Sequence, residues 1–145
     1  MRSFFISLSI FVLISNFSSS EVIEFTNAKY SGDVVDGKEH GYGVLKYDSG
    51  KVYRGEFKNG EMDGYGELKW ASGSIYKGQF KNGTCEGVGK WTNKDSSSIY
   101  IGDFIHCDFQ GFGKQFFTDS SSCIRTSESS YKCSCSLYRI HYRLY

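Results

Sequence analysis

The chain has 145 residues, of which 17% are aromatic, and its 17 glycines and complete lack of proline favour one β-rich domain. Removal of residues 1–20 would take away one basic residue, Arg2, and leave 16 Lys and Arg against 16 Asp and Glu. The remaining chain then has a formal net charge of zero, with lysines spread along the sequence among acids. Such a pattern argues against nucleic-acid binding, which requires clustered cations.

Residues 1–20 have the organisation of a secretory signal peptide. A basic start, Met1–Ser3, precedes an apolar run of 14 residues from Phe4 to Phe17, and Ser18–Ser20 offer small residues for cleavage. A membrane-spanning helix needs about 20 apolar residues, so the run is short for a permanent anchor. We therefore expect a secreted protein or one in the lumen of the secretory pathway. The alternatives are an uncleaved membrane anchor and an apolar N-terminal strand.

Residues 21–29 follow the predicted signal peptide and contain the segment Val22–Phe25. This segment predicts a short strand. An open sheet leaves unpaired backbone groups at both ends, so we expect this strand to cap the N-terminal end of a sheet.

A tyrosine followed two residues later by glycine recurs at a nearly constant period. The spacings between successive tyrosines are 23, 23 and 24 residues, which indicates a repeat architecture. Each unit has a Gly-x-Gly pair that begins eleven residues after its tyrosine, and the first three units have a glycine seven residues after it. The four units cover residues 30–52, 53–75, 76–99 and 100–117, and begin with Tyr30, Tyr53, Tyr76 and Tyr100.

Each unit predicts a β-hairpin. In the second unit, Val52–Phe57 forms one strand, Asn59-Gly60 the turn and Gly64–Trp70 the other strand. Asn-Gly favours a type I′ turn, because both central residues of that turn have positive φ. Tyrosine and phenylalanine share a strand face with glycines, so we expect aromatic rings to fill the space that missing side chains leave. Eight such strands would make a sheet about 38 Å long.

The last two units depart from this pattern. Lys94–Ser98 contains one extra residue and no glycine, which predicts a longer and softer loop between the third and fourth units. Cys107 occupies the position of the turn glycine in the fourth unit, which predicts a less regular hairpin.

The combination Tyr-x-Gly-x-Phe-Lys-Asn-Gly followed by Gly-Tyr-Gly-x-Leu-x-Trp resembles the MORN repeat over residues 30–117. The resemblance implies a curved antiparallel sheet that binds proteins or membranes, often linked to phosphoinositides, membrane junctions or cytoskeletal scaffolds. MORN proteins are typically cytosolic, whereas the predicted signal peptide indicates a secretory location for this chain. The expected fold is all-β, an elongated single antiparallel sheet of consecutive hairpins with short cap strands and an irregular Cys/Ser-rich C-terminal tail.

The C-terminal tail, residues 118–145, has two parts. Residues 119–136 are rich in serine and cysteine and predict irregular structure. Residues 137–145 alternate between apolar and polar side chains, which predicts a strand that caps the second end of the sheet.

The five cysteines would form disulfides in an oxidising compartment, and their odd number leaves one unpaired. Cys85 and Cys107 lie near the hairpin ends of adjacent units. Neighbouring units are about 10 Å apart, beyond the ~7 Å limit for a disulfide, so we expect these cysteines to bond to the tail instead. Cys133 and Cys135 are too close in sequence for an ordinary mutual bond and are expected to pair outward, and they make a weak zinc signal. The disulfide candidates are Cys85, Cys107, Cys123, Cys133 and Cys135.

Three other motifs have ordinary structural explanations. Gly32–Glu39 imitates a phosphate-binding loop but ends in glutamate, and its Gly-x4-Gly spacing recurs in the next two units, so it reflects the repeat. No two of the histidines His40, His106 and His141 have metal-binding or catalytic spacing, and no nucleophile elbow is present. We predict no catalytic residue, metal ligand or cofactor. Asn82-Gly83-Thr84 is a candidate N-glycosylation site on an exposed turn, or a turn followed by an incidental threonine.

The middle residues of the Gly-x-Gly pairs are the candidate binding face. Tyr42, Tyr65, Val88 and Phe112 project away from the glycines, one per unit, and would form a row. Such a row, flanked by Lys46, Lys69 and Lys90, is suited to a peptide, a second array or a lipid headgroup region. Alternatively, these side chains only cover the sheet or pack under the tail.

We therefore expect a noncatalytic binding or scaffolding module for a protein partner or a membrane lipid surface, with self-association through the sheet edges as a further option. One alternative is a small secreted enzyme on a β-scaffold. The other is a fragment related to MORN-containing phosphatidylinositol phosphate kinases, although no kinase domain fits in this chain.

Overall fold

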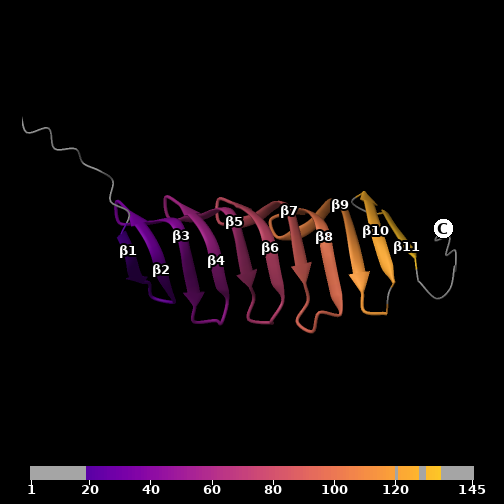
Figure 1. Cartoon of the computed structure of the whole chain (residues 1–145), viewed down its shortest axis with the longest axis horizontal. Helices are drawn as coiled ribbons and strands as arrows, with labels where there is room; N and C mark the ends of the chain where they lie inside the picture. The colour runs from indigo at the N-terminus through magenta and orange to yellow at the C-terminus, as the bar shows by residue number, and fades with distance from the viewer. Residues whose placement is uncertain (1–18, 120, 128–129, 135–145) are drawn as a thin grey trace, which may run out of the picture.

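The computed structural model describes residues 19–119, 121–127 and 130–134, which form one open antiparallel sheet (Figure 1). Each strand pairs with the next one in sequence, so the chain is a continuous series of hairpins. The strands are β1 (Ser19–Glu24), β2 (Ala28–Val35), β3 (Lys38–Tyr47), β4 (Val52–Lys58), β5 (Glu61–Lys69), β6 (Ile75–Lys81), β7 (Thr84–Thr92), β8 (Ser98–Ile105), β9 (Asp108–Phe117), β10 (Ser122–Ser127) and β11 (Ser130–Ser134).

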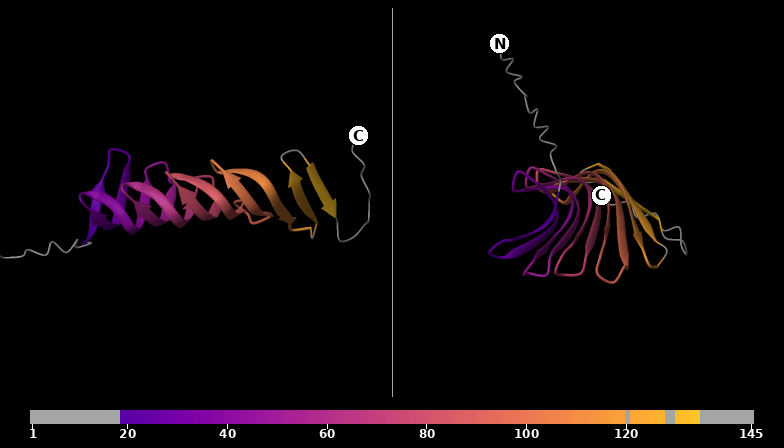
Figure 2. Two further views of the ribbon diagram at one scale, coloured as in Figure 1. Left: turned by 90° about the horizontal axis from the view of Figure 1, so that it is seen from above. Right: turned by 60° about the vertical axis from the view of Figure 1, so that its left-hand side comes forward.

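The sheet is elongated and strongly curved, as the two views of Figure 2 show. The predicted fold class is therefore confirmed. The eight strands expected from the four units are β2–β9, and β1 precedes them where the N-terminal cap strand is predicted. The predicted signal peptide lies outside the described residues except for its last two positions, and the predicted strand over 137–145 lies wholly outside them.

The hairpin turns have the backbone conformation that the Asn-Gly pairs predict. Asn59 and Gly60 have φ of 54° and 92°, as a type I′ turn requires. His106 and Cys107 adopt the same conformation, with φ of 53° and 66°. The prediction of a less regular turn in the fourth unit is therefore wrong, because Cys107 accepts the left-handed conformation usually given to glycine.

The loop between the third and fourth units is longer, as predicted, but side chains organise it. The Asn93 amide donates to the Ser97 hydroxyl at 2.7 Å, and its carbonyl oxygen accepts from the Ser98 N–H at 2.9 Å. Asp95 accepts from the Ser97 N–H at 3.0 Å. These bonds replace the glycine turn of the first two units.

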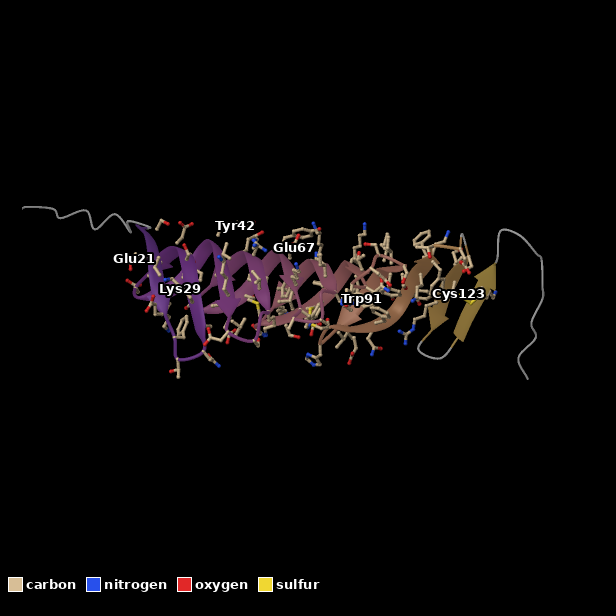
Figure 3. The ribbon with its side chains drawn as sticks, turned by 90° about the horizontal axis from the view of Figure 1, so that it is seen from below. Glu21, Lys29, Tyr42, Glu67, Trp91 and Cys123 are labelled. Carbon is tan, nitrogen blue, oxygen red and sulfur yellow. A yellow bond between two sulfur atoms is a disulfide. The ribbon has the colours of Figure 1, made fainter. Side chains whose placement is uncertain are left out.

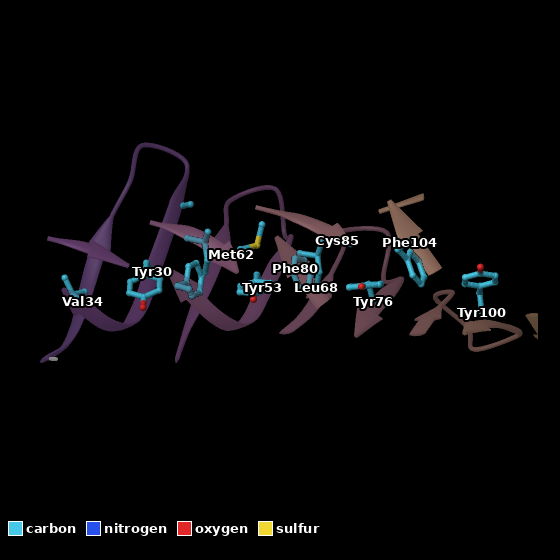
Figure 4. Packing of buried hydrophobic residues seen from close by; sticks show 13 residues of the cluster. Tyr30, Val34, Tyr53, Met62, Leu68, Tyr76, Phe80, Cys85, Tyr100 and Phe104 are labelled. Carbon is cyan, nitrogen blue, oxygen red and sulfur yellow. The ribbon is translucent and has the colours of Figure 1, made fainter. Parts of the chain in front are cut away.

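The core is a row of tyrosines and phenylalanines on one face of the sheet (Figure 4). The tyrosine of each of the first three units contacts the phenylalanine of the following unit edge to face, for example Tyr53 and Phe80, whose ring centroids are 4.8 Å apart. The rings pass from unit to unit, so neighbouring units stabilise one another. The core tyrosines are Tyr30, Tyr53, Tyr76 and Tyr100, all essentially inaccessible to solvent.

Paired glycines make room for these rings, as the sequence predicts. A Cβ added at Gly55 or Gly66 would lie 2.5 Å from an atom of the Tyr53 ring system. The Tyr53 hydroxyl donates to the Glu56 carbonyl at 2.9 Å, which satisfies the polar end of the buried ring. Burial raises the pKa of the Tyr30 and Tyr76 phenols to about 12.

The tail contains ordered strands where irregular structure is predicted. β10 pairs with β9 and β11 pairs with β10, so the Ser- and Cys-rich segment extends the sheet. Cys123 and Cys133 face each other across these strands and form a disulfide. The prediction fails because the unpaired edge of β9 offers backbone partners, which the serine content does not reveal. Arg125 lies buried at this end and donates to the Phe109 carbonyl.

Cys85 and Cys107 form the second disulfide, with their Cα atoms 4.5 Å apart. The prediction that these cysteines are too distant is wrong. It used the spacing between equivalent positions of neighbouring units, which are two strands apart, whereas Cys85 and Cys107 occupy different positions in their units. Cys85 is the second residue of β7, and Cys107 lies in the turn after β8, the adjacent strand. The Cys107 N–H donates to the Cys85 carbonyl at 3.1 Å, just as the Gly60 N–H donates to the Glu39 carbonyl of the preceding unit. Cys135 lies outside the described residues.

Candidate binding face

The face of the sheet opposite the tyrosine core is exposed and carries three parallel rows of side chains. Strand alternation defines them, since residues two apart share a face. The first row contains Tyr42, the second Val44 and the third Lys46, all from β3. The paired register carries each row across the sheet, and we call this side the exposed face.

The first row contains the residues predicted as a binding face. Tyr42, Tyr65, Val88 and Phe112 are 62%, 61%, 59% and 70% exposed, and lie on β3, β5, β7 and β9. Figure 3 shows Tyr42 together with Glu67, from the second row, standing out from the sheet. Equivalent strands of successive units therefore present one large apolar side chain each.

A shallow depression of about 280 Å³ separates Tyr42 from Tyr65. Its lining includes Arg54, Glu67 and Lys77. Lys77 forms a salt bridge of 2.7 Å with Glu67 on the neighbouring strand. The hydrogen bond that the Lys77 ammonium donates to Glu67, together with the negative charge of Glu67, raises the pKa of this ammonium. Two aromatic rings thus border a charged floor.

The exposed face becomes more apolar toward β9 and β10. Ile101 and Ile124 flank Lys114 in the second row, and are 44% and 48% exposed. The Lys114 ammonium lies 4.9 Å from the ring centroid of Phe116, in a cation–π contact. These side chains lie on the same face as Phe112 and continue its apolar surface.

A comparison with protein families gives a match to the MORN repeat over residues 30–52, 53–75 and 76–98. The chain is a MORN repeat protein. The match covers three repeats rather than the four predicted from the sequence, and the unmatched fourth unit is the one with Cys107 at its turn. The hairpin β8–β9 is nevertheless present and pairs with the third repeat through β7. No curated protein matches the chain.

The MORN repeats include an acceptor that the sequence analysis missed. Asp33 accepts from the Tyr42 N–H at 3.2 Å, and Glu56 from the Tyr65 N–H at 3.1 Å. Asp103 accepts from the Phe112 N–H at 3.0 Å. Each acceptor lies three residues after a core tyrosine, so the recurring Asp, Glu, Gln and Asp at this offset was a usable signal. These carboxylates hold the backbone that presents the apolar row.

The remaining predicted residues are not members of the exposed apolar row. Asn82 occupies the exposed turn between β6 and β7, with φ of 49°. Gly32–Glu39, the imitation of a phosphate loop, spans the end of β2, a hairpin turn and the start of β3. His106 lies 3.3 Å from Glu86, whereas His40 is in β3. His141 lies outside the described residues.

Neither a metal site nor a membrane span emerges from the described part of the chain. Over these residues, no group of three or more His, Cys, Asp and Glu side chains could hold a metal ion. Nor does this part contain a helix long and apolar enough to cross a bilayer. The comparison likewise identifies MORN repeats and no catalytic domain.

Proposed function

We propose that this MORN repeat protein is a noncatalytic binding module whose exposed apolar row docks a protein partner. The observation that supports the proposal is the repeated exposure of Tyr42, Tyr65, Val88 and Phe112, each about 60–70% accessible. Large apolar side chains gathered on one face mark interaction surfaces more often than they mark ordinary protein surface. Burial of one such side chain would contribute about 2 kcal/mol.

The geometry also favours a partner that inserts a side chain between two repeats. The depression between Tyr42 and Tyr65 has an aromatic rim and polar groups on its floor. Sites of this type bind through apolar contact and orient the ligand through a few polar groups. Asp33 and Glu56 fix the backbone of both tyrosines, so the rim needs little ordering on binding.

We place this module in the secretory pathway or outside the cell as part of the same proposal. The predicted signal peptide supports this location, and so do two disulfides, Cys85–Cys107 and Cys123–Cys133, which persist in oxidising compartments. Sequencing the N-terminus of the secreted protein tests it. A secreted chain that begins near residue 21 is the expected result, and a cytosolic chain that retains residue 1 would contradict it.

The docking proposal is tested by changing Tyr42, Tyr65 and Phe112 to serine together. Proximity labelling in secreting cells should identify partners of the unaltered protein that the triple variant loses. A matched variant with Lys38, Lys58 and Lys94 changed to serine alters three exposed positions at turns or strand ends and should keep the same partners. Thermal unfolding checks that both variants fold.

Two outcomes would contradict the proposal. One is a folded triple serine variant that keeps every partner. The other is a triple serine variant that loses binding to lipid vesicles but keeps its protein partners, because the apolar row would then bind a membrane surface.

A further inference from the structure

Six basic side chains gather on the exposed face of β2–β7, although they are scattered along the sequence. In the second row, Arg54 of β4 is followed across the sheet by Glu67, Lys77 and Lys90. In the third row, Lys29 of β2 lies opposite Lys46 of β3, and Val52 separates Lys46 from Lys69. These six side chains are all exposed. We call this set the basic band: Lys29, Lys46, Arg54, Lys69, Lys77 and Lys90.

Few acids neutralise the basic band. Lys77 pairs with Glu67 at 2.7 Å, and Lys29 pairs with Glu24 of β1 at 2.9 Å. In the part of the chain that the structure describes, the other four band cations have no carboxylate within 4.0 Å. The nearby acids of the first row are occupied, since Asp33 and Glu56 accept backbone N–H groups. The band is therefore a positive surface on a chain whose formal net charge is only +1.

The positions of the band cations lower the stability of the sheet. Lys29 and Lys46 are direct cross-strand partners, and so are Lys77 and Lys90. Like charges placed directly opposite each other destabilise a sheet. A bound anion would offset this repulsion.

Two depressions follow one another along the band and share Arg54. One of about 370 Å³ is lined by Lys29, Ser31, Lys46 and Arg54, with Val22 and Val44 as apolar walls. The other is the depression between Tyr42 and Tyr65, to which Arg54 and Lys77 contribute. Ammonium, guanidinium and hydroxyl donors beside flat aromatic rings suit a ligand that alternates anionic groups with weakly polar rings.

We propose that the basic band binds a linear sulfated polysaccharide that runs across the strands. The band extends from β2 to β7, about 24 Å at the usual strand spacing, so its length fits a polymer better than a single anion. Separate sulfate groups can engage successive strands, and the sugar rings can lie over Tyr42 and Tyr65. The choice of sulfate as the anion rests on the secretory location proposed above, because sulfated polysaccharides are anionic polymers of the extracellular space.

The test uses the mature, disulfide-bonded chain and heparin as the sulfated probe. Isothermal titration at several salt concentrations should give an affinity that falls as salt rises, because bound cations release counterions. A variant with Lys46, Arg54 and Lys90 changed to glutamine should bind about tenfold more weakly and with a smaller salt dependence, since three ionic contacts are lost. Changing Lys38, Lys58 and Lys94 to glutamine removes the same charge outside the band and should leave the affinity unaltered.

Further probes identify the ligand class. Heparin stripped of its sulfates should not bind, and double-stranded DNA or vesicles containing phosphatidylserine should bind more weakly than heparin. Equal binding by both glutamine variants, equal binding of desulfated heparin, or tighter band-dependent binding of DNA or vesicles would each overturn the proposal. Changing Val88 and Phe112 of the apolar row to serine should leave the heparin affinity unaltered, because neither residue lines the two depressions, so failure of the protein-docking proposal is distinguishable from failure of this one. A cytosolic chain that retains residue 1 would contradict the secretory location and therefore the choice of a sulfated ligand, and it would leave the test of protein docking unchanged.

Discussion

Tyr53 lies directly over Gly66, so closely that a Cβ added at this glycine would be 2.5 Å from the tyrosine ring. The ring has no room to move away, because it packs edge to face against Phe57 at 5.1 Å and Phe80 at 4.8 Å. The same relationship recurs between the tyrosine and the glycine pair of every unit. The tyrosine-glycine contact is therefore the element that makes a single curved sheet stable without a second layer.

Replacing Gly66 with alanine should destabilise the protein by about 3 kcal/mol, because the methyl group overpacks a site that cannot relax. Gly83→Ala is the matched control. Its Cβ would contact nothing within 4 Å, and only the φ of 80° makes it unfavourable, at about 1 kcal/mol. Urea denaturation gives both free energies of unfolding. A Gly66→Ala loss no larger than that of Gly83→Ala would show that the ring is free to shift.

The disulfide between Cys85 and Cys107 should compensate for the missing turn glycine of the fourth unit. The double variant Cys85→Ala/Cys107→Ser removes this disulfide, which joins residues 22 apart in sequence. Its free energy of unfolding should be lower by about 3 kcal/mol. Cys85→Ala/Cys107→Gly loses the same link but relieves a φ of 66°, so it should be about 1 kcal/mol more stable than the serine variant. Thermal and urea unfolding measure the difference. Equal stability of the two variants would mean that the turn is not strained by a side chain.

The repeat was predictable from the sequence because its signals are local. Asn59-Gly60 specifies its own turn, and the spacing of Tyr53 and Gly66 follows from two strands joined by that turn. The exposed row containing Tyr42 also followed from strand alternation.

Features that depend on contacts between units were not predictable in this way. Cys85 and Cys107 meet because the turn of one unit lies against a strand of the preceding unit, which repeat spacing alone does not reveal. The full basic band was not predictable for a similar reason, although Lys46, Lys69 and Lys90 were expected to flank the apolar row. Lys29, Lys46 and Arg54 are separated by up to 25 residues in sequence, and only the register of β2, β3 and β4 brings them to one surface.

The buried phenols should make the protein sensitive to alkali. Tyr30 and Tyr76 have a pKa near 10 when exposed, and burial raises it to about 12, because desolvation disfavours the phenolate. The stability that depends on the neutral phenols is complete below pH 10 and is lost as the pH rises through 12. Circular dichroism and phenolate absorbance should therefore report unfolding in this range.

Tyr30→Phe/Tyr76→Phe provides the control for the alkaline transition. Each substitution removes a hydroxyl that donates to a backbone carbonyl, at 2.7 Å to Asp33 and 2.9 Å to Gln79. The double variant should be less stable at pH 7 by about 2 kcal/mol but should lose less stability between pH 10 and 12. A pH dependence identical to that of the unaltered protein would assign the transition to other groups.

Asn82 should carry an N-linked glycan when the full chain is expressed in secreting eukaryotic cells. The residue is exposed in the turn between β6 and β7, and Thr84 supplies the hydroxyl that the acceptor sequence requires. Thr84→Val keeps the Asn82-Gly83 turn and the branched side chain at the start of β7, yet removes the acceptor sequence, so it should abolish the glycan without unfolding the hairpin. Gel mobility before and after glycosidase treatment measures the modification, and a chain lacking residues 1–20 should remain unmodified in the cytosol. A full-length protein whose mobility is unaffected by both the glycosidase and Thr84→Val would contradict modification at this turn, and the argument for the secretory route would then rest on the disulfides and the signal peptide alone.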